Sequence, residues 1–496
     1  MKKLLLALGV SACGLAAHAQ TDEDALRYSQ TQLFGTARGA AVGGATGALG
    51  SDFTGLSVNP ASIALYKRSE FTITPGLSFV NTSSDFLGNT NQSHKYNFNL
   101  SNLGLVFTWN RDPKVITSSK WKSFSFGVGA NRIANFHNDV FYKGFNSSNS
   151  LLNNYVQQIP SGITSANLNE AFPFDVSLAY QTGLIRPYPD STGYFSPLTI
   201  GGLEQSRTAT TRGGITDYSL TFGGNYNDKL MLGIGLGIEG LRYLSESTYT
   251  ERDVNDSIPD FNRFDYTYNL HTFGAGVNGR IGLVYKANDV IRIGASAQTP
   301  TYYSLNDQWD SRIHAEYNSA IRDTVSPQGT FKYALVTPWK VTGSVAAIIK
   351  KYGFLSVDYE WQDYSSAYFN FNTGSNTADR EYQERQNNVI ANKYTGAGTL
   401  RLGGELALDI FRLRAGYSLG MTPFASGKAT SGFDNARSSY SAGFGFLEDN
   451  FSLDFGYVHS LVHTYEQPYS VSNGEVPGAR FTTKANHFLL TLGYKF

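Results

Sequence analysis

Bulky apolar side chains alternate with small or polar ones along most of the chain after Lys67. In Leu230–Ile238, LMLGIGLGI, one face is apolar throughout, whereas the other face is almost bare because it is mostly glycine. Phe354–Trp361 and Leu400–Leu408 follow the same period of two, with charged residues on the second face. This period predicts β-strands with one apolar and one polar face. A soluble sandwich gives the same alternation, so alternation alone leaves the architecture open.

The predicted connections between strands fall into two length classes. Short polar turns are expected at 225–229, 286–289, 350–353, around Asp409 and at 448–450, and long loops at 246–269, 302–331, 367–397, 422–436 and 464–482. Outer-membrane barrels have short turns at the periplasmic end and long loops at the exterior end. The segregation of loop lengths therefore favours a transmembrane barrel over a sandwich.

The pattern predicts fourteen strands. They lie near 69–81, 95–110, 121–134, 213–226, 229–244, 270–286, 289–301, 333–349, 353–366, 396–409, 410–421, 437–448, 450–463 and 482–496. Residues 172–183 also resemble a strand, but bacterial single-chain barrels have even strand numbers. We therefore assign 172–183 to a large exterior insertion at about 135–212, with a helix near 151–158. The last strand ends in Phe496 and places alternate aromatic and aliphatic residues on one face, which resembles the signal read by the barrel-assembly machinery.

The stretch 34–66 has a different composition from the rest of the chain. It contains six glycines between Gly35 and Gly50 and ends at Asn59-Pro60-Ala61. The preceding residues, 21–34, predict a short helix that Thr21 and Asp24 can cap. A phosphate loop is disfavoured because no strand precedes the glycines and no lysine follows them. Small residues allow close approach of backbone to backbone, so we expect residues 20–67 to plug the lumen of a barrel formed by residues 68–496.

The first nineteen residues predict an export signal. Met1-Lys2-Lys3 is basic, residues 4–16 are apolar, and Ala17-His18-Ala19 fits a cleavage site, so we expect cleavage after Ala19. A competing interpretation is a lipobox at 10–13, in which Cys13 becomes the lipidated first residue. Cleavage after Ala19 leaves a mature chain without cysteine and excludes disulfides. The predicted location is the bacterial outer membrane.

Composition narrows the choice of partners. The formal net charge is zero, which gives no indication of nucleic acid binding. Mean hydropathy is −0.26, a value usual for soluble proteins but also found in barrels, because only alternate residues face lipid. We expect no cofactor, no metal site and a monomeric chain.

The N-terminal motifs resemble the hatch of the FadL/TodX family of outer-membrane transporters for hydrophobic compounds. The candidate hatch and gate residues are Gly35, Arg38, Gly43, Gly44, Asp52, Asn59, Pro60 and Ala61. The resemblance is dense over about the first sixty mature residues and otherwise rests on strand layout. It implies an all-β, 14-stranded antiparallel transmembrane β-barrel with an N-terminal hatch in its lumen.

The resemblance also implies a function. Family members take up long-chain fatty acids or aromatic hydrocarbons passively. Exterior loops capture the ligand, which enters a pocket above the hatch and leaves through a gap where the third strand kinks inward. In this chain the third strand is 121–134, and Gly127, Gly129 and Ala130 are the candidates for that kink because glycine weakens a strand. The implied partners are a hydrophobic ligand and outer-membrane lipid.

Charged residues at lumen-facing positions are candidates for ligand contact. An anionic head group would pair with arginine, whose planar fork matches a carboxylate. The candidates, chosen because their neighbours along the strand are apolar, are Arg280, Arg292, Arg401, Arg412 and Arg414. The alternative for each is a structural ion pair with luminal acids such as Glu239, Asp358, Glu360, Glu405 and Asp454.

Three classes of function remain open. A gated transporter is favoured by the hatch and by aromatic loops. The alternatives are a general porin, or an adhesive or structural barrel, and an outer-membrane lipase. Gly416–Gly420 matches G-x-S-x-G, but a nucleophile elbow requires a strand, a turn and a helix, whereas Thr422-Pro423 begins a loop. His459 and His463 lack the glutamate of H-E-x-x-H. We therefore expect no enzymatic activity.

Overall fold

The computed structural model describes residues 20–111, 119–190, 193–198, 202–371, 376–472 and 474–496. The predicted signal peptide, including Cys13 and Ala19, lies outside the described residues, so its cleavage stays a prediction. Within the described ranges, no helix is long and apolar enough to cross a membrane.

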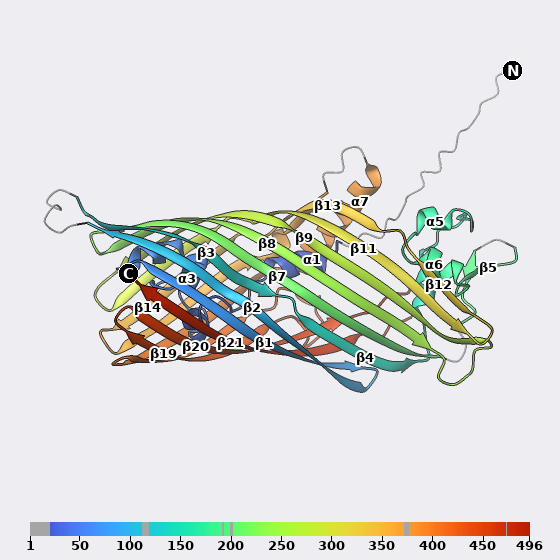
Figure 1. Ribbon diagram of the computed structural model, residues 1–496. Helices are drawn as coiled ribbons and strands as arrows, with labels where there is room; N and C mark the ends of the chain where they lie inside the picture. Colours follow the sequence, from blue (N-terminus) through green and yellow to red (C-terminus); the bar gives the residue numbers. More distant parts are fainter. Residues whose placement is uncertain (1–19, 112–118, 191–192, 199–201, 372–375, 473) are drawn as a thin grey trace, which may run out of the picture.

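Antiparallel strands form a closed wall in which the last strand pairs with the first (Figure 1). The strands of the wall are β1 Glu70–Phe86, β2 Asn89–Asn110, β3 Trp121–Asn135, β4 Asn138–Asn146, β7 Leu203–Tyr226, β8 Leu230–Arg252, β9 Phe261–Lys286, β10 Ile291–Gln298, β11 Tyr302–Tyr317, β12 Ile321–Val325, β13 Gly329–Val336, β14 Lys340–Ile349, β15 Gly353–Asp363, β16 Tyr368–Asn370, β17 Gly396–Leu408, β18 Phe411–Gly420, β19 Arg437–Glu448, β20 Phe451–Glu466 and β21 Ala479–Lys495.

Several of these pieces are parts of one wall strand. After short interruptions, β4 continues β3, β11 continues β10, β13 leads into β14, and β16 continues β15, while β12 forms a hairpin on β11. Across the described chain this gives a closed 14-stranded antiparallel barrel. The predicted fold class and strand number are confirmed.

The two ends of the barrel differ in their connections. Tight turns such as 227–229, 350–352 and 449–450 lie at the end that also carries Phe496, which we name the short-turn end. Asn227 and Asp228 have φ of 55° and 58°, which asparagine and aspartate tolerate better than other side chains. Longer connections, including 253–260 and 421–436, lie at the opposite, long-loop end.

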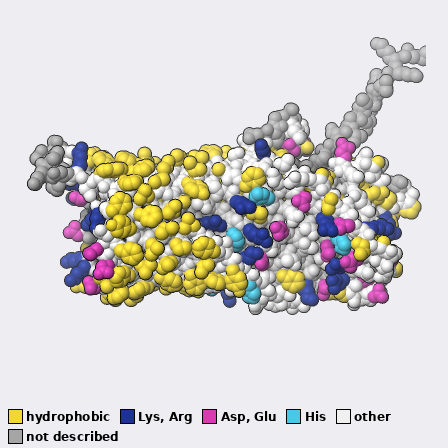
Figure 2. All heavy atoms as spheres, viewed as in Figure 1, with side chains coloured by type: hydrophobic (Ala, Val, Ile, Leu, Met, Phe, Trp, Pro, Cys, Tyr) yellow, Lys and Arg dark blue, Asp and Glu magenta, His cyan; other side chains and the backbone are white. Residues whose placement is uncertain are grey.

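Exposed apolar side chains form a band that covers most of the short-turn half of the visible face (Figure 2). On β8 the outward positions Leu232, Ile234, Leu236 and Ile238 are exposed and apolar. Strands β7, β8 and β9 contain 24, 23 and 26 residues, whereas a tilted strand crosses a membrane in about 9–11 residues. These strands therefore continue well past the apolar band toward the long-loop end.

The chain between β4 and β7 leaves the wall and covers the long-loop end (Figure 1). It contains α4 Leu151–Gln158, α5 Leu168–Ala171, α6 Val176–Gln181 and the short pair β5 Arg186–Pro187 and β6 Tyr194–Phe195. Helix α4 lies where the sequence predicted a helix, and 172–183 is not a wall strand. The outer insertion, as we name it, is 147–202 rather than the predicted 135–212, because β4 pairs with the first part of β7.

Two further regions complete the fold. After β15 the chain forms η2 Tyr364–Ser366, β16 and helix α7 Thr377–Lys393. Helix α7 packs against η2 and β16 and also contacts the first helix of the N-terminal segment. The N-terminal segment, residues 20–67, contains α1 Asp22–Ser29, α2 Ala37–Ala41, α3 Phe53–Val58 and η1 Pro60–Leu65. It lies inside the barrel (Figure 1), and most of its residues are buried.

Candidate functional site

The N-terminal segment holds its own shape through capping side chains. Thr36 accepts from the backbone N–H of Gly39 at the start of α2 and donates to Asp52 at 2.8 Å. Asp52 in turn accepts from the backbone N–H of Thr54 at the start of α3. Caps of this kind satisfy backbone donors that a helix leaves free. Asp52, a candidate hatch residue, therefore joins two turns of the segment.

Asn59 and Pro60 form a capped turn at the start of η1. The side chain of Asn59 accepts from the backbone N–H of Ala61 at 3.0 Å, and Pro60 occupies the first position of η1, where no N–H is needed. Asn59 also donates to the carbonyls of Gly47 at 2.8 Å and of Leu283 at 3.0 Å. One side chain thus fixes the turn both to the segment and to the wall.

Hydrogen bonds attach the segment to strands around the barrel. The backbone N–H of Ala37 donates to Thr491 Oγ1 at 2.7 Å, and that of Gly43 donates to Ser441 Oγ at 3.1 Å. The N–H of Gly47 donates to Asp358 at 2.8 Å. The candidate Arg38 donates to the carbonyl of Ser51 at 2.7 Å and lies 3.6 Å from Glu405. Close, distributed contacts of this kind hold the segment across the lumen.

Inward-facing glycines of the wall provide the space for these contacts. A Cβ atom at any of them would overlap with atoms of the N-terminal segment; they are Gly104, Gly127, Gly129, Gly223, Gly233, Gly282, Gly294, Gly403, Gly416, Gly443 and Gly456. At Gly416 the overlapping atom is the backbone nitrogen of Gly43, and at Gly233 it belongs to Pro60 and Ala61. The strand faces that are rich in glycine in the sequence therefore form the surface on which the segment packs.

The candidate kink residues Gly127, Gly129 and Ala130 lie in the part of β3 that pairs regularly with both β2 and β7. Gly127 faces Ile63, and Gly129 faces the ring of Phe53. The register of β3 against β7 shifts later, between Arg132 and Ala134. The predicted kink position is corrected accordingly, since these two glycines make room for the segment.

Four of the five candidate arginines have luminal partners. Arg280 donates to Asp217 at 2.7 Å and lies 3.8 Å from Glu239. Arg401 pairs with Glu360 at 3.1 Å.

The remaining three candidates also have partners within the protein. Arg414 bridges Glu405 at 2.7 Å and Asp454 at 2.6 Å. Arg292 donates to the carbonyl of Leu49, and Arg412 donates to backbone carbonyls at the short-turn end. These geometries correspond to the structural alternative, in which each arginine is already bound within the protein.

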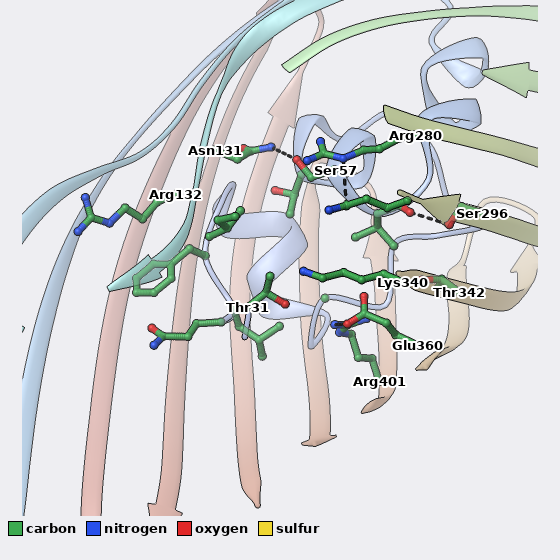
Figure 3. Close-up of a pocket in the computed structure, with 18 of the residues that line it drawn as sticks. Thr31, Ser57, Asn131, Arg132, Arg280, Ser296, Lys340, Thr342, Glu360 and Arg401 are labelled. Carbon is green, nitrogen blue, oxygen red and sulfur yellow. Dashed lines mark hydrogen bonds and ion pairs between the residues drawn. The ribbon is translucent and has the colours of Figure 1, made fainter. Parts of the chain in front are cut away.

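A cavity lies between the N-terminal segment and the wall (Figure 3). Its volume is about 90 Å³, and it is partly open to solvent. The segment contributes Thr31–Phe34, Thr54 and 57–58, and β3 contributes 131–133. Charged residues at its edge are Arg132, Glu239, Arg280, Lys340, Glu360 and Arg401. Of the candidate hatch residues, Gly44 lines this cavity.

The wall is interrupted beside this cavity. Strands β2 and β3 pair only as far as Asn102 and Asn131. Beyond that point 89–101 pairs with β1, while β4 pairs with β7. Strand β4 contacts the inward side of β1, where Thr82 donates to Asn138 at 2.8 Å and Ser84 donates to the carbonyl of Phe141. The third strand therefore turns inward behind the β1–β2 hairpin.

Side chains alone span this interruption. Asn135 Nδ2 donates to Asn97 Oδ1 at 3.4 Å, and the side chains of Asn97 and His137 lie 3.1 Å apart. The part of β2 that lacks β3 as a neighbour still carries exposed apolar residues: Tyr96 and Phe98 are each 69% exposed. The interruption therefore begins at the level of the apolar band and faces the surroundings of the barrel.

The outer insertion packs against the wall at the long-loop end. Buried residues of α4 and α6, including Leu152 and Leu178, pack against Phe264 and Ile313 of the wall. Glu251, at the outer tip of β8, accepts from the backbone N–H of Leu151 at 2.8 Å and from the hydroxyl of Ser150. Burial raises the pKa of Glu251 to about 7.

The comparisons with known proteins agree with this geometry. The family model described as outer membrane protein transport protein (OMPP1/FadL/TodX) matches residues 16–496. The chain belongs to this family. A search of curated proteins finds no match.

Solved structures of the OMPP1/FadL/TodX type share the fold. A Pseudomonas aeruginosa FadL homologue has a TM-score of 0.56 at 12% identity, and the alignment covers 94% of this chain and 100% of that one. The CymD monoaromatic hydrocarbon channel has a TM-score of 0.50 at 12% identity, with coverage of 94% and 99%. A mutant of the TodX monoaromatic hydrocarbon channel also has a TM-score of 0.50, at 12% identity with coverage of 93% and 98%. At these identities the likeness establishes the fold.

The enzymatic motif does not have the required local structure. Gly416–Gly420 lies wholly within strand β18, and residue 421 begins a loop. A nucleophile elbow would require a sharp turn into a helix at this point. The family, a group of outer-membrane transport proteins, also differs from the lipase alternative.

Sequence reasoning missed the residues at the wall interruption. Asn97, Asn135 and His137 are polar residues within strands, and their meeting depends on β4 leaving the position beside β2. Lys340, which lines the cavity, was also missed. It is the first residue of β14, directly after the break between β13 and β14 at residues 337–339. The proline at position 338 was the available signal, since proline rarely occupies a central strand.

Proposed function

We propose that this protein is a passive outer-membrane channel for hydrophobic small molecules, either long-chain fatty acids or aromatic hydrocarbons. Ligand is captured at the long-loop end, which faces the exterior, and passes to the cavity beside the N-terminal segment. It leaves through the wall between β2 and β3. The N-terminal segment acts as the hatch that blocks direct passage to the short-turn end.

The observation that carries this proposal is the position of the cavity next to the wall interruption. Residues 131–133 line the cavity and also mark the point where β3 leaves β2. Opening requires movement of side chains such as Asn97 and Asn135, because no backbone ladder joins the described strands there. A sideways route into the membrane suits an apolar ligand, which then avoids the aqueous space beyond the barrel.

The packing of the N-terminal segment supports gating over open diffusion. A general porin needs a water-filled lumen, whereas Ala37, Gly43 and Gly47 bond directly to the wall. The segment therefore suits a selective channel better than the porin alternative.

A cross-link across the interruption tests the route. Cysteines at Asn97→Cys and Asn135→Cys would stand where two side chains already lie 3.4 Å apart. The only cysteine in the sequence is Cys13, in the predicted signal peptide, so the new pair would be unambiguous. In cells that express this variant, we expect oxidation to reduce uptake of radiolabelled oleate or toluene at least tenfold and reductant to restore it.

The matched control is a pair within the regular ladder. Thr108 and Ser125 are cross-strand partners whose hydroxyls lie 3.0 Å apart. A Thr108→Cys and Ser125→Cys disulfide should leave uptake unchanged, because those strands are already joined. Undiminished uptake through the oxidised Asn97–Asn135 pair would refute the sideways route.

A further inference from the structure

Three arginines form a patch on the outer surface directly past the apolar band. Arg132, Arg212 and Arg242 lie on β3, β7 and β8, and we name them the outer arginine patch. The last exposed apolar residues before the patch are Tyr218 on β7 and Ile238 on β8. Figure 2 shows Lys, Arg and His side chains gathered beside the band on this face.

The register brings the three arginines together. Arg132 pairs with Thr216 of β7, and Arg242 pairs with Gly214 of the same strand. Arg212 is two residues farther along β7 and therefore faces the same way. A Cβ at Gly214 would overlap with the guanidinium of Arg132. The absence of a side chain at Gly214 thus lets Arg132 lie across β7 toward Arg242.

Carboxylates compensate little of this charge. Arg212 lies 3.8 Å from Glu246, and the two side chains are 51% and 55% exposed. An ion pair as exposed as this one contributes little stabilisation. In the described ranges, no carboxylate lies within ion-pair distance of Arg132 or Arg242. Arg132 donates to the carbonyl of Gly213 at 2.5 Å, while its Nε is buried without a partner.

The side chain of Arg132 faces outward, because it lies on the same face of β3 as the exposed Val128. In Figure 3 the guanidinium of Arg132 points away from the other labelled side chains.

Uncompensated arginines at the edge of a membrane are costly unless an anion meets them. The anion available at that depth is a lipid phosphate, and clustered basic side chains beside a membrane bind phosphorylated head groups. The guanidinium fork also matches phosphate geometry. We propose that the outer arginine patch binds the phosphate of an anionic lipid in the surrounding outer leaflet. This inference is independent of the transported compound.

The experiment uses purified full-length protein in detergent, with diphosphorylated lipid A as the probe and native mass spectrometry as the measurement. Each basic residue near a membrane surface contributes about fivefold in affinity, so the double variant Arg132→Gln/Arg242→Gln should bind about 25-fold more weakly. Dephosphorylated lipid A should bind the wild type no better than it binds this variant. Inorganic phosphate alone should not compete at equal concentration.

The matched control is Arg252→Gln, which removes the same charge from β8 at its outer tip, far from the band. It should bind lipid A as the wild type does. Arg212→Gln serves as a second variant, with an expected loss of about fivefold, should the double variant fail to fold. Equal binding by wild type and folded patch variants would overturn the proposal. So would equal binding of dephosphorylated lipid, or full competition by inorganic phosphate, which would indicate a simple anion site.

Discussion

At the scale of single residues, the N-terminal segment contacts the wall at glycines, which have no side chain. Gly416 contacts the backbone of Gly43, and Gly233 contacts that of Pro60 and Ala61. Backbone atoms cannot turn aside as a flexible side chain can. These positions are therefore sensitive to the addition of even one methyl group.

We predict that Gly416→Ala displaces the segment. The added Cβ would overlap with Gly43, and overpacking of this kind costs about 1–3 kcal/mol. The expected results are a lower thermal unfolding midpoint and a higher ion conductance in planar bilayers. Gly343→Ala is the control, because nothing lies within 4 Å of a Cβ at that position. Equal conductance of the two variants would contradict the prediction.

The sequence identified luminal arginines but could not identify their partners. Alternation places Arg280 and Arg401 on the inward face, and the structure agrees. Their partners Asp217 and Glu360 depend on the register between strands, and a single sequence does not contain that register. The choice between ligand contact and structural pairing therefore required coordinates.

At the scale of elements, the interruptions of the wall were harder to predict than the strands. The predicted strand 333–349 runs through the break at residues 337–339, and the predicted strand 289–301 stops at the break at residues 299–301, although β11 continues the wall beyond it. Prolines at 300 and 338 mark both breaks. The inward turn of the third strand lacks such a marker. It follows instead from the packing of β4 behind β1, which is a tertiary contact.

The outer insertion gives an element-scale prediction about pH. Burial raises the pKa of Glu251 from its ordinary 4.5 to about 7. The packed arrangement of the outer insertion is thus favoured by protonation below about pH 4.5, and this advantage is lost as pH rises through about 7. The difference is on the order of 3 kcal/mol. Hydrogen exchange of residues 147–165, corrected for intrinsic rates, should be slower at pH 5.5 than at pH 8.

The control for this prediction is Glu251→Gln, which keeps a hydrogen-bonding group beside Ser150 and Leu151 but cannot ionise. Its corrected exchange should be the same at both pH values. If the wild type exchanged equally at both values as well, Glu251 would have no part in holding the outer insertion against the wall.

At the scale of the whole molecule, the strands are longer than a membrane requires, and the excess lies toward the long-loop end. Outward positions on β7 change from apolar at Leu220 to polar at Thr208. The predicted orientation places the polar half outside the cell and the turn at Asp228 in the periplasm.

Cysteine labelling can check this orientation in intact cells. A membrane-impermeant maleimide should label Thr208→Cys readily and Leu220→Cys poorly, because the latter faces lipid. Asp228→Cys should react only after permeabilisation. Labelling of Asp228→Cys in intact cells, with protection of Thr208→Cys, would reverse the orientation.

Most of the fold was predictable at this scale, since alternation, loop lengths and even parity determine a 14-stranded barrel. The N-terminal segment could be recognised from its glycines. The wall positions that it contacts could not be recognised. Gly403 and Gly456 look like any strand glycine until their contacts with Val42 and Ala37 are known.

The bonds that attach the N-terminal segment also constrain the order of assembly. Ala37 and Gly43, near the beginning of the chain, bond to Thr491 and Ser441, near its end. These partners are separated by 454 and 398 residues, and contacts so distant in sequence form late in folding. The N-terminal segment, which is synthesised first, therefore cannot form all of its bonds to the wall until the last strands are present. The last strand is therefore needed both to close the barrel wall and to complete the bonds of the N-terminal segment.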